Sequence, residues 1–370
     1  MNNKIKNIVV TATFVAFIAI FVILCTIAYF NPVKTSESER RPLAQFPEKI
    51  TWSGIVDKSV IEGFEDYSVD QFPLREFFRS LKARFHLKVL GLKENNGMTE
   101  VDGYIAKIEP EFTDGLVDYS VGRLEYIYNK FLKDNGGDVF VSIVPDKNYF
   151  LGRDYGYPSP DYAALVDKVK TALSEAEYVD IFDSLELSDY YRTDTHWSQD
   201  KIGEVVDKLS AALGIGDRLS DKYTEKSLNG FKGVYYLQSA LYPQPDTLVY
   251  LENDVINDLK VFDYEKNKEI GGVYDPASFE SEDGYNFFLY GTRALLRIDN
   301  PNATTDDELV IFRDSFGASI TPLLAQGYKS VYVVDIRYIM PDFLGSFIDF
   351  EGKDVLFLYS TLVLNQKAFK

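Results

Sequence analysis

Short apolar runs that alternate with helical patterns are the feature that most constrains the fold of this 370-residue chain. Four of the runs after residue 100 are typical of buried strands, and they span residues 138–145, 308–312, 330–335 and 353–359. A further run at 177–182 also predicts a strand, and helical patterns occupy 162–176 and about 200–213. This alternation predicts an α/β domain with an open, mostly parallel sheet flanked by helices on both faces. Only the aromatic-rich stretch 220–290 has a less regular pattern.

The first 30 residues contain the longest apolar stretch. Residues 8–30 carry no charge, and a helix of that length spans a hydrocarbon core of roughly 30 Å. A cleaved signal peptide is the alternative, but Thr26-Ile27-Ala28 is a poor cleavage site and the stretch exceeds the usual h-region. Long domains translocate largely regardless of flanking charge. We therefore expect a cytoplasmic tail at 1–7 and a single-pass anchor at 8–30 in the cell membrane, with the main domain extracytoplasmic.

Residues 31–100 are expected to form a stalk and a helical juxtamembrane segment. The stalk is rich in proline, serine and glutamate. Between Ile55 and Leu92, apolar residues recur at steps of three and four, which predicts helices. Pro73 interrupts the pattern and is expected to open the second helix. Residues 101–370 then form the main domain.

The composition excludes several classes of function. The formal net charge is −18, and no basic stripe is apparent in that balance, so nucleic acid and anionic lipid surfaces are poor partners. The only cysteine, Cys25, lies inside the apolar stretch, so the outer part has no disulfide and no thiolate metal site. A metal held by Asp194 and His196 would need carboxylates alone to complete its ligands. We expect neither a metal nor a cofactor.

Two short motifs carry the candidate chemistry. The chain has only two histidines, and one stands in the motif Asp194-Thr195-His196-Trp197. Far downstream, Arg313-Asp314-Ser315 follows an apolar strand. Aspartate, histidine and serine are the parts of a nucleophilic triad, in which the carboxylate orients the imidazole and the imidazole activates the hydroxyl. Both motifs are expected to follow strands, which would place them at the same edge of the sheet.

Plainer explanations stay open for each motif. Ser315 suits a helix cap as well as a strand-to-helix turn that offers backbone N–H groups to an oxyanion. Asp194 and His196 also suit a surface turn around a packed tryptophan. Five further positions are candidates for oxyanion donation or substrate binding: Gly233, Gly291, Trp197, Lys147 and Arg313. The glycines equally suit turns, and the lysine equally suits an ion pair.

Several motifs occur together in a fixed order. They are Glu39-Arg40-Arg41-Pro42-Leu43, Asp70-Gln71-Phe72-Pro73, Val144-Pro145-Asp146-Lys147, Thr193–Trp197, Phe231–Tyr235, Arg313–Ser315 and Asp335–Tyr338. With this set, nearly everything after the anchor resembles the DHHW family of membrane-anchored bacterial proteins, which is related to the alginate O-acetylation proteins AlgJ and AlgX. The resemblance implies an SGNH-hydrolase-like domain whose catalytic residues are Asp194, His196 and Ser315.

The resemblance also implies a function. In such systems a membrane-bound O-acyltransferase supplies acetyl groups across the membrane, and the anchored domain transfers or hydrolyses them on an exported cell-surface polysaccharide. We therefore expect a serine-dependent acyltransferase or esterase. The alternative is a non-catalytic glycan-binding or scaffold protein of an export complex, since aromatic side chains such as Tyr190, Tyr191 and Trp197 suit sugar faces.

Two positions depart from the family pattern. Thr195 stands where the name-giving motif has an additional histidine. Tyr290-Gly291-Thr292 stands where relatives often have Gly-Gly-Asn, so an asparagine is not expected there as an oxyanion donor.

Overall fold

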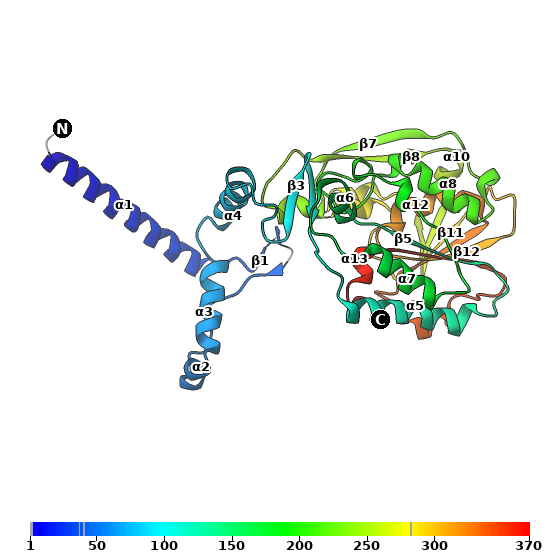
Figure 1. Cartoon of the computed structure of the whole chain (residues 1–370), viewed down its shortest axis with the longest axis horizontal. Coiled ribbons are helices and arrows are strands. Elements are labelled where there is room, and N and C mark those ends of the chain that lie inside the picture. The colour runs from blue at the N-terminus through cyan, green and yellow to red at the C-terminus, as the bar shows by residue number, and fades with distance from the viewer. Residues whose placement is uncertain (1–2, 37, 40, 282) are drawn as a thin grey trace. The chain divides into compact units, whose positions relative to one another are not determined.

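The computed structural model describes residues 3–36, 38–39, 41–281 and 283–370. Arg40 of the Glu39–Leu43 motif and the first two residues of the expected tail lie outside these ranges. The described residues form two compact units (Figure 1). The smaller unit contains the chain up to Asn95 together with Leu237–Tyr242, and the larger unit contains Asn96–Tyr236 and Pro243–Lys370.

An eight-stranded sheet organises the larger unit, in the order β10-β9-β11-β13-β12-β14-β5-β6. Its strands are β5 Val139–Val144, β6 Glu177–Tyr178, β9 Lys260–Asp263, β10 Lys268–Gly271, β11 Leu295–Asp299, β12 Glu308–Arg313, β13 Ser330–Val334 and β14 Asp354–Ser360. Neighbours from β13 to β6 pair in parallel, whereas β11, β9 and β10 are added in antiparallel pairs. The predicted α/β fold with a mostly parallel sheet is confirmed.

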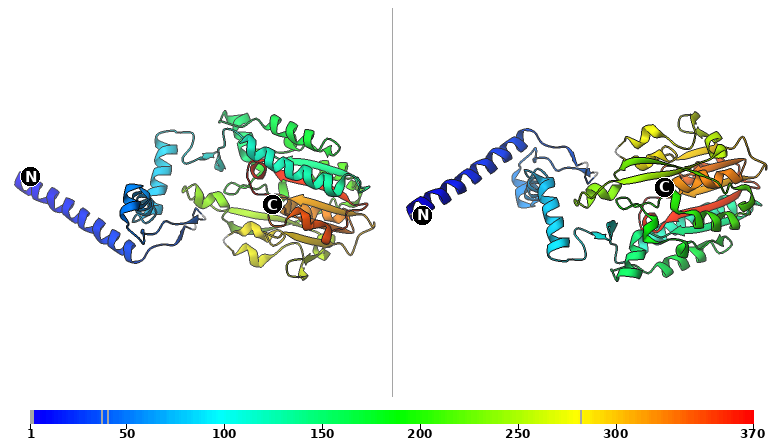
Figure 2. Two further views of the ribbon diagram at one scale, coloured as in Figure 1. Left: turned by 90° about the horizontal axis from the view of Figure 1, so that it is seen from below. Right: turned by 90° about the horizontal axis from the view of Figure 1, so that it is seen from above.

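Helices cover both faces of this sheet (Figure 2). The helices are α1 Asn3–Phe30, α2 Trp52–Val56, α3 Ser59–Asp70, α4 Arg75–Arg84, α5 Asp114–Ile127, α6 Lys147–Tyr155, α7 Tyr162–Ala172, α8 Gly203–Ala212, α9 Val234–Gln238, α10 Asp254–Asp258, α11 Pro276–Phe279, α12 Gly317–Leu324 and α13 Thr361–Leu364. Along β12, Leu309 and Ile311 pack with α6, α8 and α12, while Val310 and Phe312 pack with α5 and α7. Both faces of the strand are therefore buried, which explains why its sequence is a continuous apolar run.

The stretch 220–290 is more regular than its sequence predicts. Strands β7 Thr224–Phe231 and β8 Asp246–Glu252 form an antiparallel pair, and β9 and β10 extend the main sheet. Most residues of β7 are exposed, so the strand has none of the apolar alternation that marks a half-buried strand. The predicted strand 177–182 is, conversely, only two residues long and gives way to a 3₁₀ turn at Phe182–Ser184.

The smaller unit contains the apolar N-terminal helix α1 and the helices α2, α3 and α4. Among the described residues, α1 is the one helix long and apolar enough to cross a membrane, and none of its central residues is buried. A π-helical turn, η1 Phe85–Val89, continues α4, so helices do occupy most of the predicted region. Short strand pairs complete the fold: β1 Thr35–Ser36 with β2 Arg41–Pro42 here, and β3 Met98–Val101 with β4 Tyr104–Lys107 in the larger unit.

Two glycine-to-alanine substitutions are expected to have opposite effects on stability. A Cβ atom on Gly137, just before β5, would lie 2.0 Å from the carbonyl oxygen of Lys353, so the strand ends must separate. We expect Gly137→Ala to lower the free energy of unfolding by about 1–3 kcal/mol. Gly122, exposed in α5 with open space around it, is the matched control, and Gly122→Ala should raise stability by roughly 0.5–1 kcal/mol. Equilibrium denaturation measures both, and equal effects would contradict the close approach at Gly137.

Candidate functional site

Ser315 lies in the tight turn between β12 and α12. The carboxylate of Asp314 fixes this turn: its Oδ1 accepts the Phe316 N–H at 2.9 Å, and its Oδ2 accepts both the N–H (2.8 Å) and the hydroxyl (2.6 Å) of Ser360. Since Ser360 ends β14, two adjacent parallel strands are joined at their carboxyl ends. Ser315 itself is only half-buried, so its hydroxyl is displayed at this edge of the sheet.

Asp194 and His196 lie in a loop that is closed by an antiparallel bridge between Tyr190 and Trp197. The loop follows β6 in the chain, but 3₁₀ turns separate it from the end of that strand. Asp194 is fully buried and accepts three hydrogen bonds. Its Oδ1 accepts the backbone N–H of His196 at 3.0 Å and the ring Nδ1 at 2.5 Å, and its Oδ2 accepts the Val234 N–H at 2.7 Å.

These donors decide the charge of Asp194. Burial alone would raise the pKa of this carboxyl, but the His196 ring and the two backbone N–H groups lower the pKa to about 2. The carboxylate is therefore ionised at neutral pH. Such an acceptor keeps the proton of a neutral imidazole on Nδ1 and leaves Nε2 free to accept a proton.

The structure brings the three predicted residues into one hydrogen-bonded chain. The Nε2 atom of His196 lies 2.7 Å from the Oγ atom of Ser315, on the side of the ring opposite Asp194. The ring is held from one face by Tyr285, whose ring stacks on it with centroids 3.7 Å apart and an angle of 4° between the planes. The Tyr285 hydroxyl donates to Ser319 of α12 at 2.9 Å. The base is thus fixed relative to the helix that follows the serine.

Tyr285 and Ser319 were not identified from the sequence. Tyr285 lies in a 3₁₀ turn, η7 Gly284–Phe287, within the stretch that shows no regular pattern. In a chain with 26 tyrosines, nothing local distinguishes this one. Ser319 carried only a weak signal, as a small residue at the start of the helix after Ser315.

Trp197 and Arg313 are buried beneath the loops that carry Asp194, His196 and Ser315, which corrects their predicted role in substrate binding. Trp197 is 0% exposed, and its indole N–H donates to Ser319. Arg313 is 2% exposed and donates to the carbonyl oxygens of Asp314 and Gly291. Burial lowers the pKa of Arg313. Both side chains support the turns that carry the triad and are not available to a substrate.

Lys147 is also placed differently from its prediction. The side chain is 3% exposed, and its ammonium donates to the backbone carbonyls of Ile105 (2.8 Å) and Arg192 (3.3 Å) rather than to a carboxylate or a substrate. Arg192 begins the loop that carries Asp194. Burial lowers the pKa of Lys147 to about 7, against the opposing charges of Asp194 and Asp246. Lys147 therefore joins this loop to β4.

The two candidate glycines do not offer free N–H groups. The Gly233 N–H donates to Thr193 Oγ1, and a Cβ atom there would lie 2.3 Å from the Cβ atom of Asp194. The Gly291 N–H donates to the carbonyl of Phe288, and a side chain there would collide with Asn286. Both glycines allow a close approach and are not oxyanion donors. By contrast, the N–H of Ser315 has no acceptor among the described residues.

The position that departs from the family motif has a structural role. Thr195 is half-buried, and its hydroxyl accepts a hydrogen bond from the Tyr235 hydroxyl at 3.2 Å. It does not contact His196 or Ser315 through any hydrogen bond within the described ranges. The hydrogen-bonded triad is therefore complete without a second histidine.

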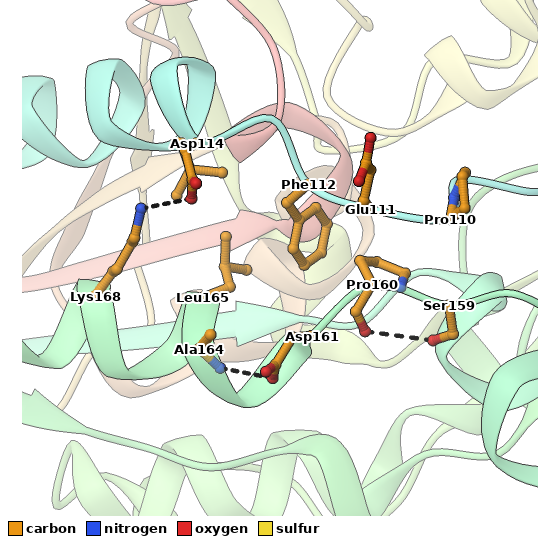
Figure 3. Close-up of a pocket in the computed structure, with 11 residues that line it drawn as sticks. Pro110, Glu111, Phe112, Asp114, Ser159, Pro160, Asp161, Ala164, Leu165 and Lys168 are labelled. Atoms are coloured by element: carbon orange, nitrogen blue, oxygen red, sulfur yellow. Dashed lines mark hydrogen bonds and ion pairs between the residues drawn. The ribbon is translucent and has the colours of Figure 1, made fainter.

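A cavity of about 200 Å³ lies between the start of α5 and the start of α7 (Figure 3). Phe112 and Leu165 line it, and an ion pair between Lys168 and Asp114 crosses its rim. None of the predicted site residues lines this cavity. In the part of the chain that the structure describes, no group of three His, Cys, Asp or Glu side chains could hold a metal ion.

The main sheet is mostly parallel and flanked by helices, and Ser315 follows one of its central strands. The model of the DHHW protein family matches residues 179–334, a range that contains both motifs of the candidate site. The resemblance to the DHHW family that the motifs indicated is borne out over these residues.

Two solved structures share this fold, and a third shows a weaker similarity. A DHHW family protein from Eubacterium siraeum is 22% identical, with a TM-score of 0.61 over 74% of this chain and 94% of that one. PatB1 from Bacillus cereus, solved with a sulfonyl adduct, is 18% identical, with a TM-score of 0.57 over 74% and 96%. The O-acetyltransferase domain of Pseudomonas putida AlgJ is 14% identical, with a TM-score of 0.46 over 73% and 93%. No curated protein matches the sequence.

Replacement of Asp314 tests how much the serine turn depends on this carboxylate. In Asp314→Asn, an amide NH₂ group replaces one carboxylate oxygen and cannot accept a hydrogen bond. At least one N–H or hydroxyl group that donates to the carboxylate therefore loses its acceptor. We expect the free energy of unfolding to fall by about 1–3 kcal/mol, the cost of a buried unsatisfied polar group. Urea denaturation measures this loss. Asp221→Asn, at an exposed position, is the control and should change stability by less than about 0.5 kcal/mol; an equally small effect at Asp314 would contradict the assignment.

The buried lysine gives a pH-dependent prediction. Because the folded-state pKa of Lys147 is about 7 and its ordinary value is 10.5, the unfolded chain binds more protons between these values. The stability of the wild type relative to Lys147→Met should therefore increase with pH by roughly 1 kcal/mol per unit from about pH 7 to 10, and stay constant below this range. Denaturation at several pH values measures the slope. Lys222→Met, at an exposed position, should show no such slope, and a flat difference for Lys147 as well would show that its amine stays protonated.

Proposed function

We propose that the protein is a membrane-anchored, serine-dependent acyltransferase or esterase that acts on an exported cell-surface polysaccharide. The observation that carries the proposal is the hydrogen-bonded chain from Asp194 through His196 to the half-exposed Ser315. In this proposal residues 1–7 are a cytoplasmic tail, 8–30 are the anchor, 31–100 are the stalk and juxtamembrane helices, and 101–370 are the extracytoplasmic catalytic domain.

Each member of the triad has a defined part in the proposed reaction. Ser315 Oγ attacks the carbonyl carbon of an acyl ester while His196 Nε2 takes its proton, and Asp194 stabilises the imidazolium. The tetrahedral oxyanion collapses, and the leaving alcohol departs with the proton from His196. The acyl-serine is then attacked by a sugar hydroxyl or by water, which gives its proton to His196. The second tetrahedral intermediate collapses, His196 returns the proton to Ser315 Oγ, and the acylated sugar or the free acid leaves.

The Ser315 N–H is the proposed donor to the oxyanion. It has no competing acceptor among the described residues, and it lies in the turn that Asp314 fixes. One such preorganised donor contributes about 3 kcal/mol to transition-state stabilisation. Gly233 and Gly291 are not assigned this part, because their N–H groups are already bonded.

The resemblance to the DHHW family supports an acetyl group as the acyl group and a membrane-bound O-acyltransferase as the donor partner. The apolar α1 supports attachment to the cell membrane. The alternative of a glycan-binding module rested on clustered aromatic side chains. Four of the five aromatic residues behind that alternative are buried, namely Tyr190, Tyr191, Trp197 and Tyr235, and the fifth, Tyr236, is half-buried. They offer little stacking surface to a sugar, so the catalytic proposal is favoured.

Hydrolysis of a chromogenic acetyl ester tests the proposal. We expect the wild type to release 4-nitrophenol from 4-nitrophenyl acetate, and Ser315→Ala to reduce kcat/KM by at least about 10³-fold, as expected for loss of a triad nucleophile. The control is Ser188→Ala, at an exposed serine, which should leave the rate unchanged. Equal turnover by Ser315→Ala and the wild type would refute the role of the serine.

Covalent labelling gives an independent measurement of the same prediction. PatB1 has been solved with a sulfonyl adduct. In the present protein, phenylmethylsulfonyl fluoride should transfer its sulfonyl group to Ser315 Oγ with release of fluoride, and peptide mass spectrometry should locate the added mass. Labelling that persists in Ser315→Ala would contradict the proposed nucleophile.

A further inference from the structure

The helix α4 and its continuation η1 expose their apolar side. Large apolar side chains recur at helical spacing on this side, and each is between 45% and 68% exposed: Leu74, Phe77, Phe78, Leu81, Phe85 and Val89. A surface helix of a soluble protein has the opposite arrangement, with its apolar stripe facing the core. A contiguous exposed apolar surface of this kind marks an interaction site.

The side of α4 that faces its own unit carries charged side chains around one buried small residue, Ala83. Arg75 forms ion pairs with Glu39 and Asp70, and Arg79 donates to the hydroxyl of Ser38. The carboxylate of Asp70 accepts in turn from Arg41 of β2, and its pKa is lowered by that hydrogen bond. The charged side is therefore occupied within the unit, and the apolar side is left outward.

The charge of this segment is opposite to that of the chain as a whole. Residues 72–92 contain five lysines and arginines and one glutamate, a net charge of +4 in a chain of net charge −18. Lys82, Arg84 and Lys88 are all exposed beside the apolar side chains. The overall acidity argues against an anionic lipid surface as a partner, but the charge is not evenly distributed.

The segment also begins beside the apolar helix α1. The ring of Phe72, just before α4, lies 5.6 Å from the ring of Phe21, centroid to centroid. Phe21 precedes the last residue of α1 by nine positions, which corresponds to roughly 13 Å along a helix. Leu24 and Ile27 of α1 line a cavity of about 680 Å³ together with Leu74 and Phe77. The start of α4 therefore lies at the level of the apolar part of α1, not beyond its end.

We infer that residues 72–92 form an interfacial segment whose apolar side inserts into the outer leaflet of the membrane and whose lysines and arginines bind anionic lipid headgroups. Three observations together fit a lipid surface: the apolar side of the helix faces outward, the segment is positively charged, and it begins in contact with α1. An apolar side with basic flanks is the arrangement that binds in the plane of an anionic membrane. The inference rests on the proposed membrane anchoring by α1, and it does not depend on catalysis by Ser315.

The inference is tested with the full chain reconstituted in vesicles. Cys25→Ser removes the one native thiol, and single cysteines at Leu81→Cys and Phe85→Cys carry the environment-sensitive fluorophore NBD. The matched control is Glu65→Cys, at an exposed position of α3. The vesicles consist of phosphatidylcholine alone or of phosphatidylcholine and phosphatidylglycerol in equal parts.

We expect labels at 81 and 85 to show a blue-shifted emission in the mixed vesicles, quenching by spin-labelled lipid and protection from iodide, and the label at 65 to be quenched by iodide. In a variant with Lys82→Glu and Lys88→Glu, the blue shift in mixed vesicles should fall to the value in phosphatidylcholine alone. Labels at 81 and 85 that are as accessible to iodide as the label at 65 would overturn the inference. Protection that appears only when a membrane-bound acyltransferase is added would also overturn it, in favour of a protein partner.

Two further measurements separate this inference from the proposed function. The intact mass of the vesicle-bound chain shows whether α1 is retained, and therefore whether anchoring holds. Ser315→Ala in the labelled background should abolish ester hydrolysis without changing the emission of either label. Buried labels in a chain without esterase activity would refute the catalytic proposal alone, whereas exposed labels in an active chain would refute the interfacial segment alone.

Discussion

Asp194 can act on His196 only because a buried carboxylate is fully compensated. Moving a carboxylate out of water costs several kcal/mol unless hydrogen bonds and opposite charge replace the solvent. Here three N–H groups point at Asp194, two of them from His196 and one from Val234. The Val234 N–H reaches Asp194 only because Gly233 has no Cβ atom to collide with it. The orientation of the imidazole, and with it the approach to Ser315, depends on this compensation.

The loop of Asp194 is held by groups that the sequence misassigns. Lys147 was a candidate for a substrate contact or an ion pair, and Trp197 was a candidate for substrate binding. The structure buries both. Lys147 donates to the backbone carbonyls of Ile105 in β4 and Arg192 in the loop of Asp194, and Trp197 donates to the hydroxyl of Ser319 in α12. Whether a polar side chain faces solvent or supports a turn depends on packing between distant segments, and no local pattern shows it. The triad was recognisable for a different reason: its residue types define the chemistry wherever the chain places them.

Burial also explains which strands could be predicted from the sequence. The strands β5, β12, β13 and β14 are buried on both faces, so each is a continuous apolar run that stands out in the sequence. Strands β7 and β10 are mostly exposed or half-buried, and β6 has two residues, so burial leaves little pattern in them. Strand β11 is buried but short, and its run is broken by Arg297. In α4 the helical spacing was correctly recognised, but the direction of its apolar stripe was not, because spacing alone does not say what the stripe faces.

The chain runs without interruption from Val234, which donates to Asp194, into the smaller unit. The segment Leu237–Tyr242 belongs to the unit that contains α1 and α4. Its carbonyls at Gln238 and Leu241 accept hydrogen bonds from Arg79 and Arg84 of α4. Val234, which binds Asp194, is only three residues earlier in the chain and lies in the same short helix, α9. If α4 lies in the membrane surface as inferred, the polypeptide that holds the triad's carboxylate is continuous with a segment held by that surface. The backbone N–H that donates to Asp194 and the carbonyls that accept from α4 are therefore on one continuous stretch of chain.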